Sequence, residues 1–207
     1  MPAARALPVK VNLGRHLQMT FVGSSAGSPG ADRPASAAPR ALLEGDEALE
    51  RFRPLFEPQG VIVAGVSKHP GKFGFAAFHN LLRFGYRGDV FPVSRDGGEI
   101  LGRRAYRDVT EVPRNRADLV FVCTPSTVNA QLLQACHEAG VRAAFVASGC
   151  YRETGAEGEV RERDLVKTAD ELGLVLAGPN GQGLISTSLS MCAQIVPPYP
   201  PRDLSPS

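Results

Sequence analysis

A short apolar run followed by a glycine-rich turn and a helix-forming segment most constrains the fold of this chain. The run covers residues 61–64, the turn covers 65–74, and residues 75–82 have their apolar side chains at helical spacing. Backbone N–H groups at a helix N-terminus point at a ligand, and the helix dipole favours negative charge there. Glycine allows a close approach because it has no Cβ. The order of strand, turn and helix therefore predicts a cradle for a phosphate-bearing ligand.

Four further apolar runs extend this pattern along the chain. Residues 90–93, 118–123, 143–147 and 174–177 are expected to be strands, and helices are expected over 42–56, 158–172 and a segment that Ser126 caps. Pro92 suggests that its strand is not fully hydrogen-bonded within the sheet. Buried strands that alternate with helices indicate a parallel sheet covered on both faces. The expected fold is α/β, a doubly wound, mostly parallel, Rossmann-like sheet.

The composition divides the chain into three parts. Residues 1–41, rich in Ala, Gly, Ser, Pro and Arg with no acid before Asp32, are predicted to be a disordered tail, with a transit peptide as the alternative. Residues 42–192 are predicted to form the domain. Residues 193–207 are predicted to be a proline-rich tail, since proline interrupts both helix and sheet.

Charge and cysteine content exclude several classes of protein. The net charge of +2 is too small to indicate a nucleic-acid partner, and no apolar run approaches the roughly 18 residues of a membrane span. The four cysteines show neither a C-x-x-C pair nor metal-ligand spacing, so free thiols in a cytoplasmic protein without a metal site are expected.

Small and polar residues follow each expected strand. In a doubly wound sheet the ligand lies beyond the carboxyl ends of the strands. The predicted ligand contacts are accordingly Gly65, Ser67, Lys68, Gly71, Lys72, Phe73, Gly74, Ser94, Arg95, Thr124, Pro125, Ser126, Ser148, Gly149 and Asn180.

The glycine turn matches neither common nucleotide motif. Ser67 occupies the position of the second glycine in G-x-G-x-x-G. A P-loop would need glycine at Val66 and a hydroxyl residue at Phe73, so ATP binding through this turn is not expected. Lys68, His69 and Lys72 supply positive charge that suits a diphosphate.

The end of the second strand narrows the choice of ligand. An NAD-binding domain would place a carboxylate about 20 residues beyond the glycines. Here the order is Ser94, Arg95, Asp96, and a guanidinium suits a phosphorylated ribose. Both NADP and coenzyme A carry such a phosphate. The negative charge of Asp96 argues against a phosphate here, and this side chain is expected either to face solvent or to pair with Arg95.

Several segments in matching order resemble a known family. They are Leu55-Phe56-Glu57-Pro58, the turn 65–74, Asn80-Leu81-Leu82, Gly85-Tyr86-Arg87-Gly88, Val90-Phe91-Pro92-Val93, Glu99-Ile100-Leu101-Gly102 and Gly178-Pro179-Asn180. Together they resemble the N-terminal CoA-binding domain of ADP-forming acetate–CoA ligases and, more distantly, the succinyl-CoA synthetase α subunit. The resemblance implies a Rossmann-like domain in which the turn holds the phosphates of coenzyme A and the strand ends line its adenosine and pantetheine.

The chain departs from this family at two strand ends. The family usually has Val-Asn-Pro-Lys where this chain has Val93-Ser94-Arg95-Asp96, so the lysine expected to meet coenzyme A is absent and its ribose phosphate would be bound only if Arg95 substitutes. Ala147-Ser148-Gly149-Cys150-Tyr151 replaces the family's Ser-Ala-Gly-Phe but stays small and polar at its start.

The resemblance also implies a second domain with a phosphorylated histidine and an ATP-grasp domain, and none of the four histidines matches that position. The leading hypothesis is a module that binds coenzyme A or acyl-CoA and makes acyl-CoA only with a separate ligase or ATP-grasp partner; no catalytic residue is assigned. The alternatives are an NADP-dependent oxidoreductase and a redox or acyl-CoA sensor acting through Cys123 or Cys150.

Overall fold

The computed structural model describes residues 9–12, 18–21 and 45–196, which fall into two compact units divided after Arg51. The first unit contains an antiparallel pair, β1 (Val9–Asn12) and β2 (Gln18–Phe21). The prediction of a disordered tail over 1–41 did not include this pair. The rest of that prediction, and residues 197–207 of the predicted proline-rich tail, lie outside the described residues.

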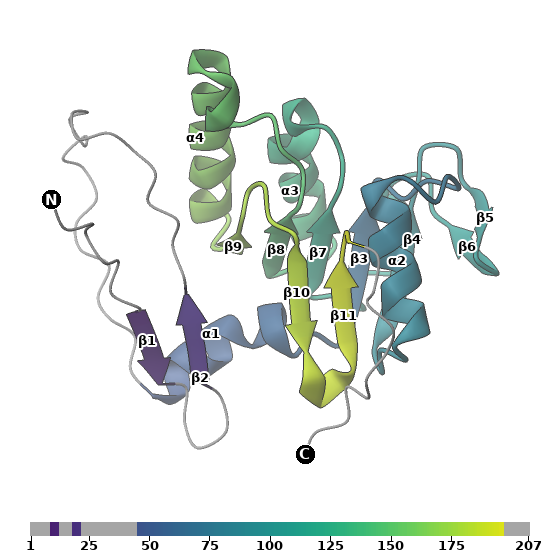
Figure 1. The fold of residues 1–207 in the computed structure, drawn as a ribbon, viewed down its shortest axis with the longest axis horizontal. Helices are drawn as coiled ribbons and strands as arrows, with labels where there is room; N and C mark the ends of the chain where they lie inside the picture. The colour runs from purple at the N-terminus through teal and green to yellow at the C-terminus, as the bar shows by residue number, and fades with distance from the viewer. Residues whose placement is uncertain (1–8, 13–17, 22–44, 197–207) are drawn as a thin grey trace, which may run out of the picture. The chain divides into compact units, whose positions relative to one another are not determined.

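A parallel sheet forms the centre of the second unit (Figure 1). Its strands are β3 (Gly60–Ala64), β4 (Asp89–Val93), β7 (Leu119–Val122), β8 (Ala143–Val146) and β9 (Val175–Ala177). They lie in the order β4-β3-β7-β8-β9, and all four pairs are parallel. The predicted doubly wound α/β fold is confirmed, and the order reverses between β3 and β7.

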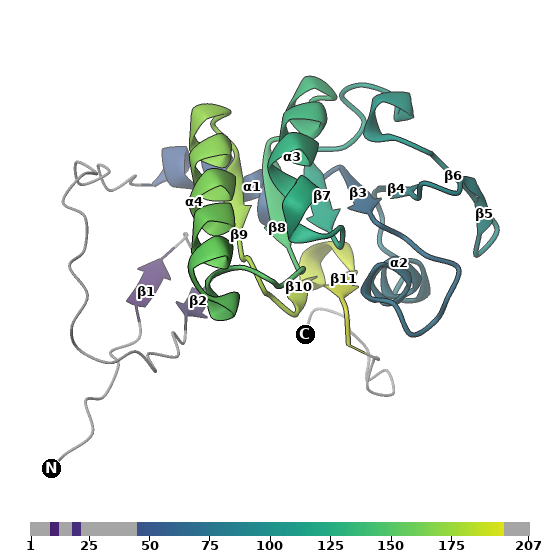
Figure 2. The same cartoon turned by 90° about the horizontal axis from the view of Figure 1, so that it is seen from above.

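Each strand contributes side chains to two separate apolar layers. In β3, Val61 and Val63 face one cluster, while Ile62 and Ala64 face the other. Helix α2 (Phe73–Arg83) covers the first face, and α3 (Asn129–Glu138) and α4 (Ala156–Glu171) cover the second (Figure 2). The three central strands β3, β7 and β8 are buried along their whole length and carry no polar side chain, because both of their faces are covered.

The helix boundaries differ from the predictions by a few residues. Helix α1 (Asp46–Phe56) ends where the prediction over 42–56 ends, and residues 42–44 lie outside the described residues. Helices α2 and α4 each begin two residues earlier than expected. Ser126 does not cap α3: it begins a 3-10 turn, η2 (Ser126–Val128), and Val128 at the N-cap position makes no side-chain capping bond. Val128 is also 44% exposed, so it does not belong to the buried face of α3.

Pro92 lies on an edge strand, as its missing N–H requires. Its carbonyl oxygen accepts a hydrogen bond from the amide of Tyr106, so this part of the edge is covered. Between β4 and β7 the chain forms a small antiparallel pair, β5 (Gly98–Ile100) with β6 (Arg103–Ala105), and the 3-10 turn η1 (Val109–Glu111).

A further antiparallel hairpin, absent from the sequence predictions, follows the sheet. It consists of β10 (Gly183–Ser186) and β11 (Met191–Gln194), joined by the 3-10 turn η4 (Thr187–Leu189). The side-chain amide of buried Asn80 in α2 donates to the carbonyl oxygens of Gln194 at 2.9 Å and Val196 at 3.2 Å. These bonds hold the last strand against α2, and the ordered chain therefore continues past residue 192.

The close approach of Gly65 to a neighbouring segment of backbone can be tested by comparing it with Gly85. Gly65 and Gly85 both have positive φ, but only at Gly65 would a Cβ meet another backbone, 2.9 Å from the carbonyl carbon of Cys123. We expect Gly85→Ala to lower the free energy of unfolding by about 1–2 kcal/mol through conformational strain. Gly65→Ala should cost about 1–3 kcal/mol more through overpacking. Urea denaturation measures both losses, and equal losses would contradict a tight approach at Gly65.

Candidate functional site

The carboxyl ends of the five strands form one continuous row of backbone. The amide of Gly65 donates to the carbonyl oxygen of Val93 at 3.0 Å, which joins β3 to β4. The amide of Cys123 donates to Ala64, and that of Ala147 donates to Val122, at 2.8 and 2.9 Å. Because the strands are parallel, the polar residues that follow them all lie along this edge.

The row is tightly packed where the strand order reverses. A Cβ on Gly65 would lie about 3.0 Å from the amide nitrogen of Thr124, and one on Gly74 would collide with the carbonyl oxygen of Gly65. Glycine is therefore required here for the turn, helix α2 and the start of the β7 loop to meet. In doubly wound sheets this point is where ligands bind.

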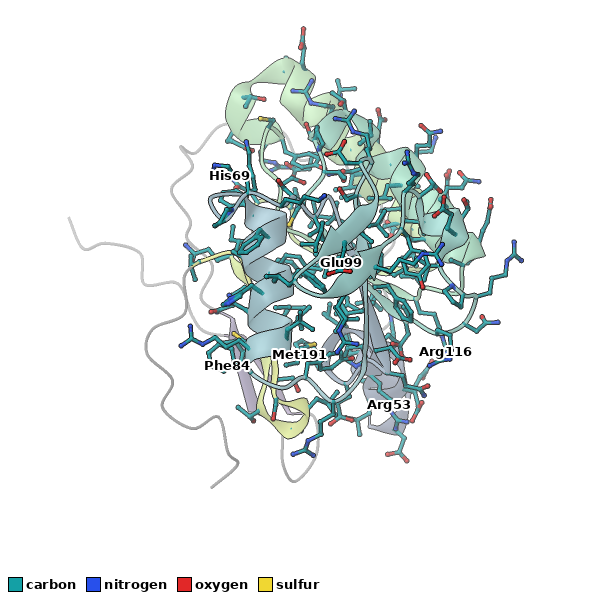
Figure 3. The ribbon with its side chains drawn as sticks, turned by 90° about the vertical axis from the view of Figure 1, so that its right-hand side faces the viewer. Arg53, His69, Phe84, Glu99, Arg116 and Met191 are labelled. Atoms are coloured by element: carbon teal, nitrogen blue, oxygen red, sulfur yellow. The ribbon has the colours of Figure 1, made fainter. Side chains whose placement is uncertain are left out.

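Hydrogen bonds inside the glycine turn hold its shape. Ser67 Oγ accepts from the amide of His69, and His69 Nδ1 accepts from the amide of Gly71, both at 3.1 Å. The amide of Lys72 donates to the carbonyl oxygen of His69 at 3.1 Å. Figure 3 shows His69 at the N-terminal end of α2, with Phe84 at the other end. The turn is thus organised by its own residues, with the imidazole as an internal acceptor.

The N-terminus of α2 retains unused donors. Lys72 occupies the N-cap position without a side-chain capping bond, and the amides of Phe73 and Gly74 have no acceptor among the described residues. No acidic side chain lies in the first turn. Lys68 and Lys72 are exposed beside it, and Phe73 is 53% exposed. Unpaired amides, the helix dipole and two ammonium groups together favour a bound anion.

The corner after β4 places an arginine near the turn. Ser94 is buried; its amide donates to Tyr106 and its carbonyl accepts from Gly97, both at 2.8 Å. Arg95 and Asp96 are both exposed and form no ion pair with each other. Of the two arrangements expected for Asp96, the solvent-facing one is therefore observed, and the guanidinium of Arg95 is left available.

A buried polar network joins the ends of β7 and β8. Asn129, fully buried at the start of α3, accepts from Thr124 Oγ1 at 2.7 Å and donates to Ser148 Oγ at 2.9 Å and Tyr151 Oη at 2.8 Å. The sequence analysis selected Thr124 and Ser148 but missed Asn129 and Tyr151. An asparagine at a helix start reads as an ordinary capping residue, and only the fold shows that it links two strand ends.

Burial controls the protonation of two groups near this network. It raises the pKa of the Tyr151 hydroxyl, although hydrogen bonds with Asn129 and Ser148 act in the opposite direction. It raises the pKa of the Cys123 thiol to about 12. Cys123 therefore stays protonated at neutral pH, which opposes its expected role as a reactive thiol. Cys150, the other candidate, is exposed and has a positive φ of 69°.

The loops after β8 and β9 pack against each other. The amide of Asn180 donates to the carbonyl oxygen of Ser148 at 3.1 Å, and Asn180 Oδ1 lies 3.3 Å from where a Cβ on Gly149 would be. Glu153, in the 3-10 turn η3 (Arg152–Thr154), accepts from the amide of Cys150 at 2.6 Å. The Glu153 carboxylate thus holds the loop conformation.

These hydrogen bonds and close contacts connect most of the predicted ligand contacts to one another. The connected residues are those of the glycine turn, Thr124, Ser148, Gly149 and Asn180. Pro125 and Ser126 stand beside them at the start of η2, and Pro125 is exposed. Among the described residues no group of three or more His, Cys, Asp or Glu could hold a metal ion. Helices long and apolar enough to cross a membrane are absent from the same residues.

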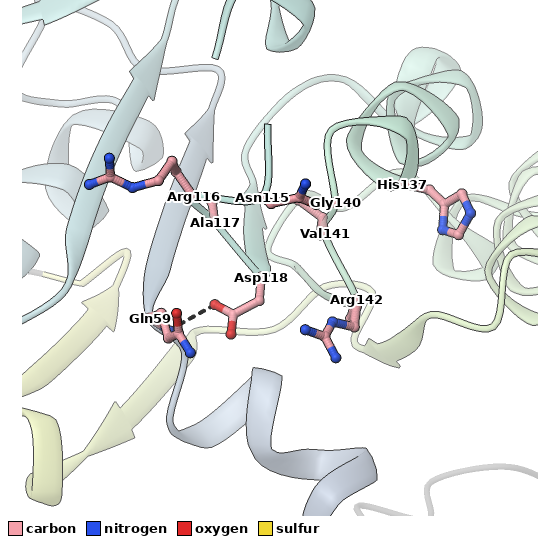
Figure 4. Close-up of a pocket in the computed structure, with 9 residues that line it drawn as sticks. All are labelled: Gln59, Asn115, Arg116, Ala117, Asp118, His137, Gly140, Val141 and Arg142. Atoms are coloured by element: carbon pink, nitrogen blue, oxygen red, sulfur yellow. Dashed lines mark hydrogen bonds between the residues drawn. The ribbon is translucent and has the colours of Figure 1, made fainter. Parts of the chain in front are cut away.

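Two surface cavities lie away from this row. One of about 350 Å³ is at the opposite, amino ends of the strands, where Asp118 accepts from the amide of Gln59 (Figure 4). The other, of about 370 Å³, flanks the outer edge of β4 and includes Arg104 and Tyr106. Neither is lined by a predicted ligand contact.

Comparisons with known proteins identify the family of this chain. Residues 59–186 match the model of the CoA binding domain. The chain is 37% identical over 147 residues to acetate–CoA ligase (ADP-forming) I subunit alpha of Pyrococcus furiosus, covering 69% of this chain and 32% of that protein. It is 37% identical over 139 residues to acetate–CoA ligase (ADP-forming) I of Archaeoglobus fulgidus, covering 67% and 20%.

A solved structure shares the fold. That structure is the dinucleotide forming acetyl-coenzyme A synthetase 1 of Ca. Korarchaeum cryptofilum in complex with phosphate and ADP, with a TM-score of 0.66 and 32% identity. The match covers 70% of this chain and 31% of that one, so the chain spans a third or less of these relatives. Because the family match extends over more than half of the sequence, this chain belongs to the CoA-binding domain family.

Proposed function

We propose that this chain is the coenzyme A-binding module of an ADP-forming acyl-CoA ligase. The observation that carries the proposal is the uncapped N-terminus of α2 at the point where the strand order reverses, with Lys68 and Lys72 beside it. That arrangement suits the diphosphate of coenzyme A. The exposed Arg95 would meet the ribose phosphate, and the ends of β7, β8 and β9 would line the pantetheine arm.

The family match supports coenzyme A as the ligand, and the two acetate–CoA ligases support acyl-CoA formation as the reaction. The match covers only 32% and 20% of the two acetate–CoA ligases, so ligase activity would require parts that those relatives have in addition. A partner carrying a phosphohistidine and an ATP-grasp domain would supply the activated acyl group. The residues of this chain would bind coenzyme A and orient its thiol.

Titration calorimetry with coenzyme A, NADP and NAD tests the choice of ligand. We expect coenzyme A to bind more tightly than either dinucleotide, because the turn lacks the dinucleotide glycine pattern. Tighter binding of NADP would instead favour the oxidoreductase.

The double variant Lys68→Ala/Lys72→Ala should weaken coenzyme A binding about tenfold. A tenfold loss of affinity corresponds to the free energy of one charged hydrogen bond. Lys167→Ala is the matched control, since Lys167 lies on α4 beside Glu171 and should have no effect. Equal losses from both variants would indicate a non-specific charge effect and contradict a phosphate site at α2.

The chain alone should not make acyl-CoA. Incubated with acetate, ATP and coenzyme A, it is expected to produce no acetyl-CoA and no ADP, since none of its described residues fits the phosphorylated histidine. His69 is bonded within the turn, and His79 stacks on Phe75. Chromatography of the products measures both compounds, and their formation by the purified chain would refute the description of a binding module.

Arg95 should distinguish coenzyme A from dephospho-coenzyme A, which lacks the ribose phosphate. Arg95→Ala is expected to weaken coenzyme A binding about fivefold to tenfold and to leave dephospho-coenzyme A unchanged, because only the former offers phosphate oxygens to the guanidinium. Arg163→Ala, on the exposed face of α4, is the control. If Arg95→Ala weakens both ligands equally, the ribose phosphate lies elsewhere.

A further inference from the structure

The outer edge of β4 is covered along only half of its length (Figure 3). At its carboxyl end, the amide of Tyr106 donates to the carbonyl oxygen of Pro92 at 2.9 Å, and the amide of Ser94 donates to Tyr106 at 2.8 Å. Backbone groups alternate between the two sides of a strand, so Val90 also points its N–H and C=O away from β3. Among the described residues, nothing outside the sheet bonds to these two groups.

The cavity of about 370 Å³ flanks this open half of the edge. Partly buried apolar side chains from both layers of the domain reach it: Leu82 and Val90 from the α2 layer, and Phe91 and Tyr106 from the opposite layer. Successive side chains of an added strand would point to opposite faces of the sheet, so one extended segment would contact both pairs. The cavity therefore suits an extended peptide backbone.

Two arginines of β6 give this cavity a positive charge. Arg103 and Arg104 both line it, both are exposed, and neither forms an ion pair with a described residue. Glu99 lies opposite Arg104 in the β5–β6 pair but does not line the cavity. The one carboxylate that does line it, Asp89, is already paired with Arg116. The cavity thus offers two uncompensated guanidinium groups to a carboxylate.

We propose that the open half of β4 binds an extended, acidic segment of a partner protein, which joins the sheet as an additional strand. The N–H and C=O of Val90 supply backbone hydrogen bonds, and Arg103 and Arg104 select carboxylates. Pro92 ends the pairing, since it has no N–H and its carbonyl oxygen is already used. A second copy of this chain would bring another pair of arginines to the same edge, so charge disfavours it. The inference does not depend on which ligand binds at the carboxyl edge.

The test begins with a phage-displayed library of random nine-residue peptides, selected on the full wild-type chain. We expect the recovered peptides to carry Asp or Glu among β-branched and aromatic residues. A fluorescein-labelled copy of the most frequent peptide is then the probe in anisotropy titrations. Recovery of no peptide, or of peptides without acidic residues, overturns the inference and leaves the proposal for coenzyme A unchanged.

Val90→Pro tests the backbone pairing. It removes the outward N–H and leaves the bonds to β3 in place, as Pro92 already does on the same edge. Binding of the probe should weaken about fivefold to tenfold, the value of one hydrogen bond. Val90→Thr is the matched control, because it keeps both the amide proton and the shape of the side chain, and it should change the affinity by no more than about twofold. Equal affinities for the two variants contradict strand addition.

Arg103→Ala/Arg104→Ala tests the charge. At low salt this double variant should bind the probe about tenfold more weakly, and the difference should shrink as salt is added. Arg163→Ala/Lys167→Ala on α4 removes the same charge elsewhere and should have no effect. Equal losses from the two double variants overturn the inference, and this comparison decides it even if urea denaturation shows that Val90→Pro does not fold. Sedimentation measures self-association: a wild-type dimer that Val90→Pro dissociates would make a second copy the occupant and also overturn the inference.

Discussion

The contact between the backbone after β3 and the backbone after β7 is the constraint on which the candidate site depends. Gly65 lies against Cys123 and Thr124 so closely that a Cβ would overlap them, and Gly74 lies closer still to Gly65. These contacts bring the N-terminus of α2 to the reversal of strand order. Any side chain at either glycine would move the helix dipole and its free amides away from the crevice.

The rest of the domain supports that contact from both faces. Alternate residues of β3 pack into two separate apolar layers, so the strand cannot shift by one residue without reversing both. The side-chain amide of Asn80 holds β11 against α2 through two hydrogen bonds. These bonds help to keep α2, the helix that follows the glycine turn, in its position. A site built from backbone amides depends on such rigidity because amides cannot adjust by rotation.

Local pattern was sufficient for the five strands of the parallel sheet, because each contains a short apolar run that is followed by small or polar residues. It failed for η2, where Ser126 has the right chemistry for a cap but the chain makes a 3-10 turn first. It also missed the β10–β11 hairpin, whose residues have no strong alternation and become ordered through contact with α2.

The sequence by itself determined the α/β class, the glycine turn and the positive charges around it, because these follow from local periodicity and residue type. Only the tertiary structure decided the strand order, the partners of Asn129 and the availability of Arg95. These features depend on contacts between segments far apart in the chain. Thr124, Asn129, Ser148 and Tyr151 become one network only when β7 and β8 pair and α3 packs behind them.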